Sequence, residues 1–232
     1  MIPIDERILA GMREQLAVRD ERLARGERQI GWKVGFGSAA AMAQLGTGRP
    51  LVGFLLAGAL LRDGATVPIG GWAAPALEPE IAVHLERDVP EGAAWDDVRA
   101  SIGGLSAAIE LADVDPPPED VRAILAGDIF QRHVMLGPVD RSRRTGEGVT
   151  ARVLRDGEEI AASDDPAALT GEIVEVVRLT AELLGAVGER LRGGEVVITG
   201  SVVAPVQLAP GQEIAVELPP LGTLRVSLGG GR

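Results

Sequence analysis

Apolar residues recur along this chain with two different periods, one helical and one typical of strands. From Ile4 to Leu16 they return every four positions, with charged residues between them. This period places the apolar side chains on one face of a helix, so we expect an amphipathic helix over residues 4–25 that ends at Gly26. The next apolar stretch, residues 29–36, predicts a strand.

The middle of the chain is divided into short apolar runs by glycine and proline. Such punctuation predicts several short strands and few long helices. We expect several strands within residues 51–87 and others over 105–114, 133–139 and 148–162, with short helices over 39–45, 95–102 and 119–126. The three consecutive prolines at 116–118 predict a rigid turn.

The last long helical pattern opens with an acidic residue followed by proline. Asp165 and Pro166 suit the cap and the first position of a helix, and apolar residues continue on one face as far as Leu191. We therefore expect a single helix there. Three or four strands should follow over residues 195–228.

Strands do not alternate regularly with helices along the chain, which argues against a doubly wound parallel sheet. We expect an α+β fold in which a rolled, barrel-like mixed sheet is flanked by helices. The 232 residues suit one catalytic domain, residues 1–232. Within it, residues 1–28 would form an N-terminal helical segment and residues 229–232 a flexible tail.

Composition narrows the partners and the compartment. The formal net charge is −11, which argues against nucleic acid or an anionic membrane surface as a partner. The absence of cysteine excludes disulfides, thiolate nucleophiles and zinc–thiolate sites. The start of the chain lacks the pattern of a signal peptide, and the most apolar run, residues 51–61, is about half a membrane span. We expect a cytoplasmic protein.

Glu78 and Glu80 lie two positions apart in a predicted strand, so both carboxylates should point to the same side. Two like charges this close repel each other unless a cation, a shared proton or water separates them. Pro79 between them cannot donate to a β-ladder, which places the strand at a sheet edge or next to a bulge. The alternative is a pair of solvated glutamates on an edge strand.

Glu110 occupies the middle of another, otherwise apolar strand, where a carboxylate is costly unless it is paired or bound to a metal. Three carboxylates without cysteine indicate an oxygen-ligand site for Mg²⁺ or Mn²⁺. We interpret the two histidines, His84 and His133, as structural. No serine–histidine–aspartate set and no Walker loop is apparent.

Lys33 is the only lysine among 23 lysines and arginines, and it lies between Gly31 and Gly35. An amine shifts its pKa readily, whereas a guanidinium stays charged. Near a cation and partly desolvated, Lys33 would have a lowered pKa and could shuttle a proton. The alternative is a chance lysine that extends to solvent from the end of a strand.

Six segments in this order resemble the 2-keto-4-pentenoate hydratase and 4-oxalocrotonate decarboxylase branch of the fumarylacetoacetate hydrolase superfamily. They are GWKVGF at 31–36, QLG at 44–46, LEPEIA at 77–82, AIELAD at 108–113, MLG at 135–137 and GEVVITGS at 194–201. The resemblance implies a mixed β-roll and a small 2-oxo acid substrate from the degradation of aromatic compounds. It also implies a homo-oligomer, or a hetero-complex with a related decarboxylase or hydratase.

The resemblance also implies roles for individual residues. Mg²⁺ or Mn²⁺ would be held at the positions of Glu78, Glu80 and Glu110, and Lys33 would be the working lysine. Ser201 would be a second catalytic residue that bonds the substrate carboxylate, although an ordinary turn serine fits the same pattern. The residues expected to contact substrate are Leu77, Thr199 and Asp128.

One segment departs from this branch. Relatives carry an Ala-Asp-Asn-Ala-Ser-like stretch where this chain has residues 126–133, and Asp128 stands at the position of the asparagine. The helix expected after Lys33 has no histidine or glutamate, which disfavours C–C bond hydrolysis. We expect a hydratase acting on a 2-hydroxypenta-2,4-dienoate-like substrate. The alternatives are a 2-oxo-3-hexenedioate decarboxylase, a C–C bond hydrolase, and a catalytically silent partner of an active relative.

Overall fold

The computed structural model describes residues 4–115 and 119–231, so the turn expected at 116–118 lies outside the described residues. The helices are α1 Glu6–Ala24, α2 Ala39–Leu45, η1 Ala57–Ala59, α3 Trp95–Ser101, α4 Val121–Ala126, η2 Asp128–Phe130, α5 Ala167–Thr170 and α6 Ile173–Ala186. The strands are β1 Gln29–Gly35, β2 Leu51–Leu56, β3 Leu60–Leu61, β4 Ala65–Pro68, β5 Pro75–Leu85, β6 Ile102–Asp113, β7 Gln131–Leu136, β8 Ala151–Arg155, β9 Glu158–Ser163, β10 Val196–Ser201, β11 Val206–Gln207, β12 Glu213–Glu217 and β13 Thr223–Gly229.

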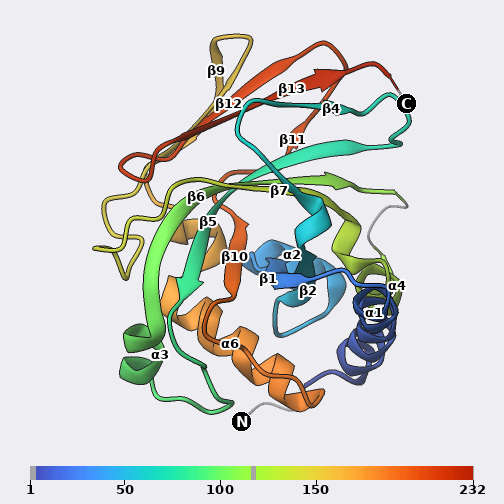
Figure 1. Cartoon of the computed structure of the whole chain (residues 1–232), viewed down its shortest axis with the longest axis vertical. Helices are drawn as coiled ribbons and strands as arrows, with labels where there is room; N and C mark the ends of the chain where they lie inside the picture. Colours follow the sequence, from blue (N-terminus) through green and yellow to red (C-terminus); the bar gives the residue numbers. More distant parts are fainter. Residues whose placement is uncertain (1–3, 116–118, 232) are drawn as a thin grey trace.

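Two sheets make up the fold. The larger runs in the order β2-β1-β10-β5-β6-β7-β3, with β11 paired to β5, and the smaller runs β4-β13-β12-β8-β9. Most pairs are antiparallel, while β1 pairs with β10, β3 with β7 and β4 with β13 in parallel. Figure 1 shows the long strands β5 and β6 curving around the middle of the molecule, with α1, α3 and α6 below and the smaller sheet above. The expected mixed, rolled sheet flanked by helices is confirmed.

The N-terminal helix is held by packing against α4. Gly11 lets the two helices approach, because a Cβ there would come within 2.8 Å of the Leu125 side chain. The buried Gln15 side chain donates a 2.8 Å hydrogen bond to the Leu125 carbonyl. Among the described residues, no helix is long and apolar enough to cross a membrane.

Strand β5 lies inside the larger sheet, between β10 and β6. Of the two positions expected for this strand, a sheet edge or a place next to a bulge, the structure shows the second. The pairing of β10 with β5 shifts between Ile198 and Ser201. The Pro79 carbonyl accepts a bond from the Val202 amide on this side. The missing N–H of Pro79 thus faces the irregular part of β10, where regular ladder pairing is already interrupted.

The single helix expected after Pro166 is two helices, so this prediction is wrong. Helix α5 ends at Gly171, whose φ of 81° lies in the left-handed region, and α6 starts two residues later. Residue 229, expected in a flexible tail, is the last residue of β13. Its carbonyl accepts a 3.0 Å bond from the Ile69 amide, because the strand continues its pairing with β4 to the end. Residue 232 lies outside the described residues.

Candidate active site

Three carboxylates meet on one face of the larger sheet. Glu78 on β5 lies directly opposite Glu110 on β6, and Glu80 is two residues further along β5, hence on the same face. One oxygen of each carboxylate lies within 4.8 Å of the others. Glu80 and Glu110 are completely buried. The expected gathering of the three residues is therefore present.

Some carboxylate oxygens of this cluster have no hydrogen-bond donor among the described residues. Glu80 Oε2 accepts a 2.7 Å bond from the Gly200 amide, which the bulge in β10 presents to it. Glu80 Oε1 and Glu110 Oε2 are buried and have no hydrogen-bond partner in the described part of the chain. Buried polar atoms are nearly always bonded, so two orphaned oxygens in one cluster need an explanation. A hard cation with oxygen ligands fits them.

The pKa values of the Glu78 and Glu80 carboxyl groups indicate their protonation in the absence of a cation. Burial, and next the neighbouring Glu110 carboxylate, raise the pKa of Glu78 to about 7. The same two causes raise the pKa of Glu80 well above its ordinary value. Both shifts favour the protonated forms of these carboxyl groups, and a divalent cation would displace the protons.

Lys33 reaches this cluster from across the sheet. It is on β1, which is separated from β6 by β10 and β5, a distance of about 14 Å in a flat sheet. Its ammonium nevertheless donates to Glu110 Oε1 and, at 3.1 Å, to the Ile129 carbonyl. The curl of the sheet thus closes β1 over the carboxylates, and only 2% of Lys33 is exposed.

The expected lowering of the Lys33 pKa is wrong for the protein without a cation. Burial lowers the pKa, but the charges of Glu110 and Glu78 outweigh it and the net shift is upward. Without the cation, the negative charges of its expected ligands dominate the surroundings of the Lys33 ammonium.

A left-handed turn supplies the second acceptor for Lys33. Asp128, Ile129 and Phe130 have φ values of 53°, 50° and 64°, a conformation that costs about 1–2 kcal/mol for each L-residue. A Cβ on Gly53 would lie 2.7 Å from Asp128 Oδ1 and 2.9 Å from Lys33 Cγ. The glycine therefore makes room for both side chains.

A cavity of about 450 Å³ opens onto the site. Lys33, Glu78, Thr199 and Ser201 line it, in agreement with the sequence-based expectation. Leu77 does not line this cavity: it alternates to the opposite face of β5 and is fully buried in the core. The Ser201 hydroxyl donates to the Val203 carbonyl at 2.7 Å.

Asp128 is also absent from the cavity lining, where we had expected a substrate contact. Its carboxylate turns back to accept a 2.9 Å bond from the Phe54 amide. Burial raises the pKa of Asp128 to about 8, although the nearby Lys33 charge opposes the shift. The role that the geometry gives Asp128 is to hold the turn that presents the Ile129 carbonyl.

The histidines lie outside the acidic cluster. His84 bonds the Ser106 hydroxyl at 2.8 Å, and the His133 ring stacks on Trp72 with 6.0 Å between centroids. Both arrangements agree with the structural reading. Sequence reasoning missed the Ile129 carbonyl, Phe36 and Phe130, because backbone conformation rather than residue type places them at the cavity.

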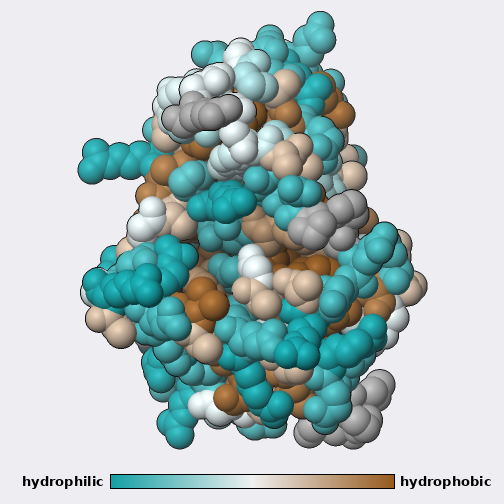
Figure 2. Space-filling model, turned by 90° about the vertical axis from the view of Figure 1, so that its right-hand side faces the viewer, coloured by the Kyte–Doolittle hydropathy of each residue, from teal (hydrophilic) through white to brown (hydrophobic). Residues whose placement is uncertain are grey.

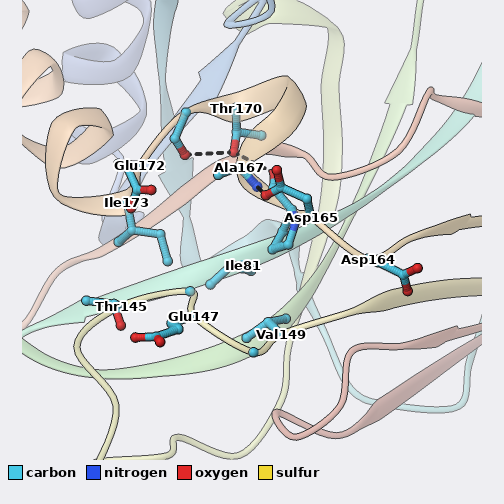
Figure 3. Close-up of a pocket in the computed structure, with 14 residues that line it drawn as sticks. Ile81, Thr145, Glu147, Val149, Asp164, Asp165, Ala167, Thr170, Glu172 and Ile173 are labelled. Atoms are coloured by element: carbon cyan, nitrogen blue, oxygen red, sulfur yellow. Dashed lines mark hydrogen bonds between the residues drawn. The ribbon is translucent and has the colours of Figure 1, made fainter.

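A second cavity, of about 330 Å³, lies on the opposite side of β5. Figure 3 shows Ile81 of β5 at its base, Glu147 on one wall, and Asp165 and Thr170 around α5 on the other. Among the lining residues are four acids and no lysine, arginine or histidine: Glu147, Asp164, Asp165 and Glu172. The cavity that holds Lys33 and Glu78 is therefore the candidate active site.

Replacing Asp128 by asparagine should stabilise the protein, and more so at higher pH. The unfolded chain releases the Asp128 proton near 3.8 whereas the folded protein keeps it to about pH 8. Stability therefore falls as pH rises through this window, by up to about 1.4 kcal/mol per pH unit. Asparagine does not ionise, accepts the same Phe54 bond and tolerates positive φ. We expect a gain of about 2–4 kcal/mol at neutral pH, after allowance for partial exposure of the residue, and almost none near pH 4.

Chemical unfolding of the metal-free protein at several pH values measures this effect. Asp156→Asn is a matched control, because Asp156 has a φ of 52° and accepts a backbone bond from Glu213 but is exposed. Equal, pH-independent shifts in both variants would contradict the prediction.

The sequence matches one protein-family model and several known enzymes. The model of the fumarylacetoacetate (FAA) hydrolase C-terminal family matches residues 31–228. A 2-keto-4-pentenoate hydratase of Paraburkholderia phymatum is 29% identical over 218 residues, covering 90% of this chain and 81% of that protein. A 4-oxalocrotonate decarboxylase of a Pseudomonas species is 26% identical over 215 residues, covering 91% and 83%.

The fold is also similar to that of a solved decarboxylase structure. The 4-oxalocrotonate decarboxylase from Pseudomonas putida G7, complexed with magnesium and adipate, superposes with a TM-score of 0.86. It is 27% identical, and the match covers 92% of this chain and 83% of that one.

Proposed function

The chain belongs to the fumarylacetoacetate hydrolase family, and on that premise we propose that it is a divalent-metal-dependent hydro-lyase for 2-hydroxypenta-2,4-dienoate-like 2-oxo acids. One observation carries the proposal. Two buried, unbonded carboxylate oxygens, of Glu80 and Glu110, lie beside the chain's only lysine, which lines an accessible cavity together with Glu78. Such an arrangement combines a cation site with a proton carrier.

In this proposal Glu78, Glu80 and Glu110 hold Mg²⁺ or Mn²⁺. Their all-oxygen donor set suits either ion, and the similar decarboxylase structure from Pseudomonas putida G7 is complexed with magnesium. The cation, when bound, would act as a Lewis acid that stabilises negative charge developing on the oxygens of a 2-oxo acid.

Proton transfer, orientation of the carboxylates and substrate binding would be performed by side chains and backbone groups of this chain. Lys33 Nζ moves a proton to and from the substrate carbon, held in place by Glu110 and the Ile129 carbonyl. The Gly200 amide fixes the orientation of the Glu80 carboxylate. Ser201 lines the cavity, and its oxygen can accept or, after turning from Val203, donate a bond to a substrate carboxylate.

The alternative functions are supported to different degrees. Decarboxylation stays open, because a hydratase and a decarboxylase match this chain to a similar extent. C–C bond hydrolysis is disfavoured, because α2 carries no histidine or glutamate to activate water. A silent partner is disfavoured as well, since the altered segment around Asp128 still builds an acceptor for Lys33. The homo-oligomer and the hetero-complex with a related enzyme stay predictions, as does the cytoplasmic location.

Metal removal and return tests the proposal. We expect protein stripped of divalent ions to leave the absorbance of 2-hydroxypenta-2,4-dienoate unchanged, and added Mg²⁺ or Mn²⁺ to start its decay. Parallel assays with 2-oxo-3-hexenedioate, followed by CO₂ release, distinguish hydration from decarboxylation. Turnover that needs no metal, or no turnover of either compound with metal, would rule the proposal out.

A further inference from the structure

The wall of the active-site cavity is chemically divided. At its base are Lys33 and Glu78, and these are the only charged residues that line it in the described part of the chain. The rest of the lining is largely apolar, and includes Phe36, Val114, Phe130, Leu169, Val203 and Pro205. Its polar side chains are neutral, so a substrate group that points away from the cation site meets mostly hydrocarbon; they are Ser38, Thr170, Thr199, Ser201 and Gln207.

Three of the four described hydroxyl groups on this wall donate to backbone carbonyls, whereas Ser38 Oγ accepts a bond from the Ala41 amide. Thr170 donates to the Pro166 carbonyl at 3.1 Å, Thr199 to the Ile81 carbonyl at 3.0 Å, and Ser201 to the Val203 carbonyl. A carboxylate at the far end of a substrate would find no cation beyond Lys33 among the described residues of this wall, and its polar partners would be neutral donors such as the Ser38 hydroxyl and the Gln207 amide. Burying such a charge without a charged partner is costly.

Two aromatic rings contribute to this wall from unusual backbone positions. Phe36 follows β1 with a φ of 54°, and Phe130 ends η2 with a φ of 64°. The chain has three phenylalanines, and these two line the cavity. Bulky side chains rarely occupy the left-handed region, and strain of this kind tends to persist where a ligand is recognised.

We propose that Phe36 and Phe130 are specificity-determining residues that select 2-oxo acids with an uncharged hydrocarbon tail and reject dicarboxylates of the same length. This inference rests on the proposed function, because it assumes that the keto-acid end lies at the carboxylate cluster. The tail accepted extends beyond a vinyl group. A volume of about 450 Å³ falls in the range of about 300–1,000 Å³ that accommodates drug-sized ligands.

A matched pair of ligands tests the inference by binding rather than by turnover. 2-Oxohexanoate and 2-oxohexanedioate have the same chain length and differ only in a methyl or a carboxylate at C6. In calorimetric titrations of the Mg²⁺-loaded protein we expect 2-oxohexanoate to bind at least about tenfold more tightly. It should also bind about tenfold more tightly than 2-oxobutanoate, because two further methylenes are buried.

A positively charged side chain on the cavity wall should reverse the preference for the uncharged tail. We expect Phe130→Arg to favour 2-oxohexanedioate by about tenfold, and Phe130→Leu to keep the wild-type order. Trp95→Arg introduces the same charge at an exposed position on α3 and should leave the order unchanged.

The outcomes separate the inference from the function on which it rests. Mg²⁺-dependent binding of both six-carbon ligands with equal affinity by the wild-type protein would overturn the inference and leave the proposed function intact. Failure of all three ligands to bind in a Mg²⁺-dependent manner would overturn the proposed function, and the inference with it. The wild-type comparison decides even if Phe130→Arg does not fold.

Discussion

Replacement of Lys33 by methionine should slow metal-dependent turnover of the 2-oxo acid by about three orders of magnitude, within the usual range for loss of a proton-transfer group. Methionine keeps an unbranched apolar stem of similar reach but has no proton to give. Arginine keeps the charge but is a poor proton carrier, so Lys33→Arg should lose activity to a similar extent.

The same replacement should also affect the metal-free fold. Without its ammonium partner, the buried Glu110 carboxylate loses one of its contacts, which is destabilising unless a cation replaces it. We therefore expect Mg²⁺ to raise the melting temperature of Lys33→Met more than that of the wild type. Steady-state kinetics and thermal unfolding, each with and without Mg²⁺, measure the two effects. Arg62→Met makes the corresponding change at an exposed cation, and full activity in Lys33→Arg would refute the proton-transfer role.

Glu80→Gln should remove metal binding while leaving the fold intact. The raised pKa of Glu80, caused by burial and the adjacent Glu110 charge, favours a protonated, neutral side chain there in the metal-free protein. Glutamine has the same shape and can accept the Gly200 bond through its amide oxygen. We expect Mg²⁺ to bind at least about 100-fold more weakly, and activity to fall more than about a thousandfold.

The sign of the stability change makes this variant informative. In the wild type the unfolded chain releases the Glu80 proton near its ordinary value of 4.5, whereas the folded protein retains it to higher pH. Above that ordinary value the metal-free wild type is therefore penalised and the variant is not. Metal-free Glu80→Gln should melt at or above the wild-type temperature, and Mg²⁺ should no longer raise it. Glu86→Gln, at an exposed position just after β5, is the control; a Mg²⁺ response in Glu80→Gln equal to that of wild type would exclude Glu80 as a ligand.

The parts of the site that depend on residue type and local period were predictable from the sequence. A period of two was enough to place Glu78 and Glu80 on one face, and the cost of a charge in an apolar strand was enough to single out Glu110. That Glu110 lies opposite Glu78 depends on the register of β5 against β6. Local pattern does not specify register, because hydrophobic residues on both faces of a buried strand are compatible with several pairings.

The parts that were missed depend on backbone conformation. The residue types of Asp128, Ile129 and Phe130 do not predict three successive left-handed residues. A β-branched residue such as isoleucine is sterically disfavoured in that conformation. The turn instead depends on long-range contacts, namely the Asp128 bond to the Phe54 amide and the close approach of Asp128 to Gly53. Gly171 is a sequence signal for the break between α5 and α6, but a weak one, because an isolated glycine within a helical pattern is often tolerated.

The burial of Lys33 has a practical consequence for following the protein in solution. No other lysine exists in the sequence, and this one is held by Glu110 and the Ile129 carbonyl with 2% of its surface exposed to the cavity. Amine-directed acylating reagents should therefore react with it only when these two contacts of its ammonium are broken. Peptide mapping separates this residue from the α-amino group, so its rate of acylation reports how often the carboxylate cluster opens to solvent.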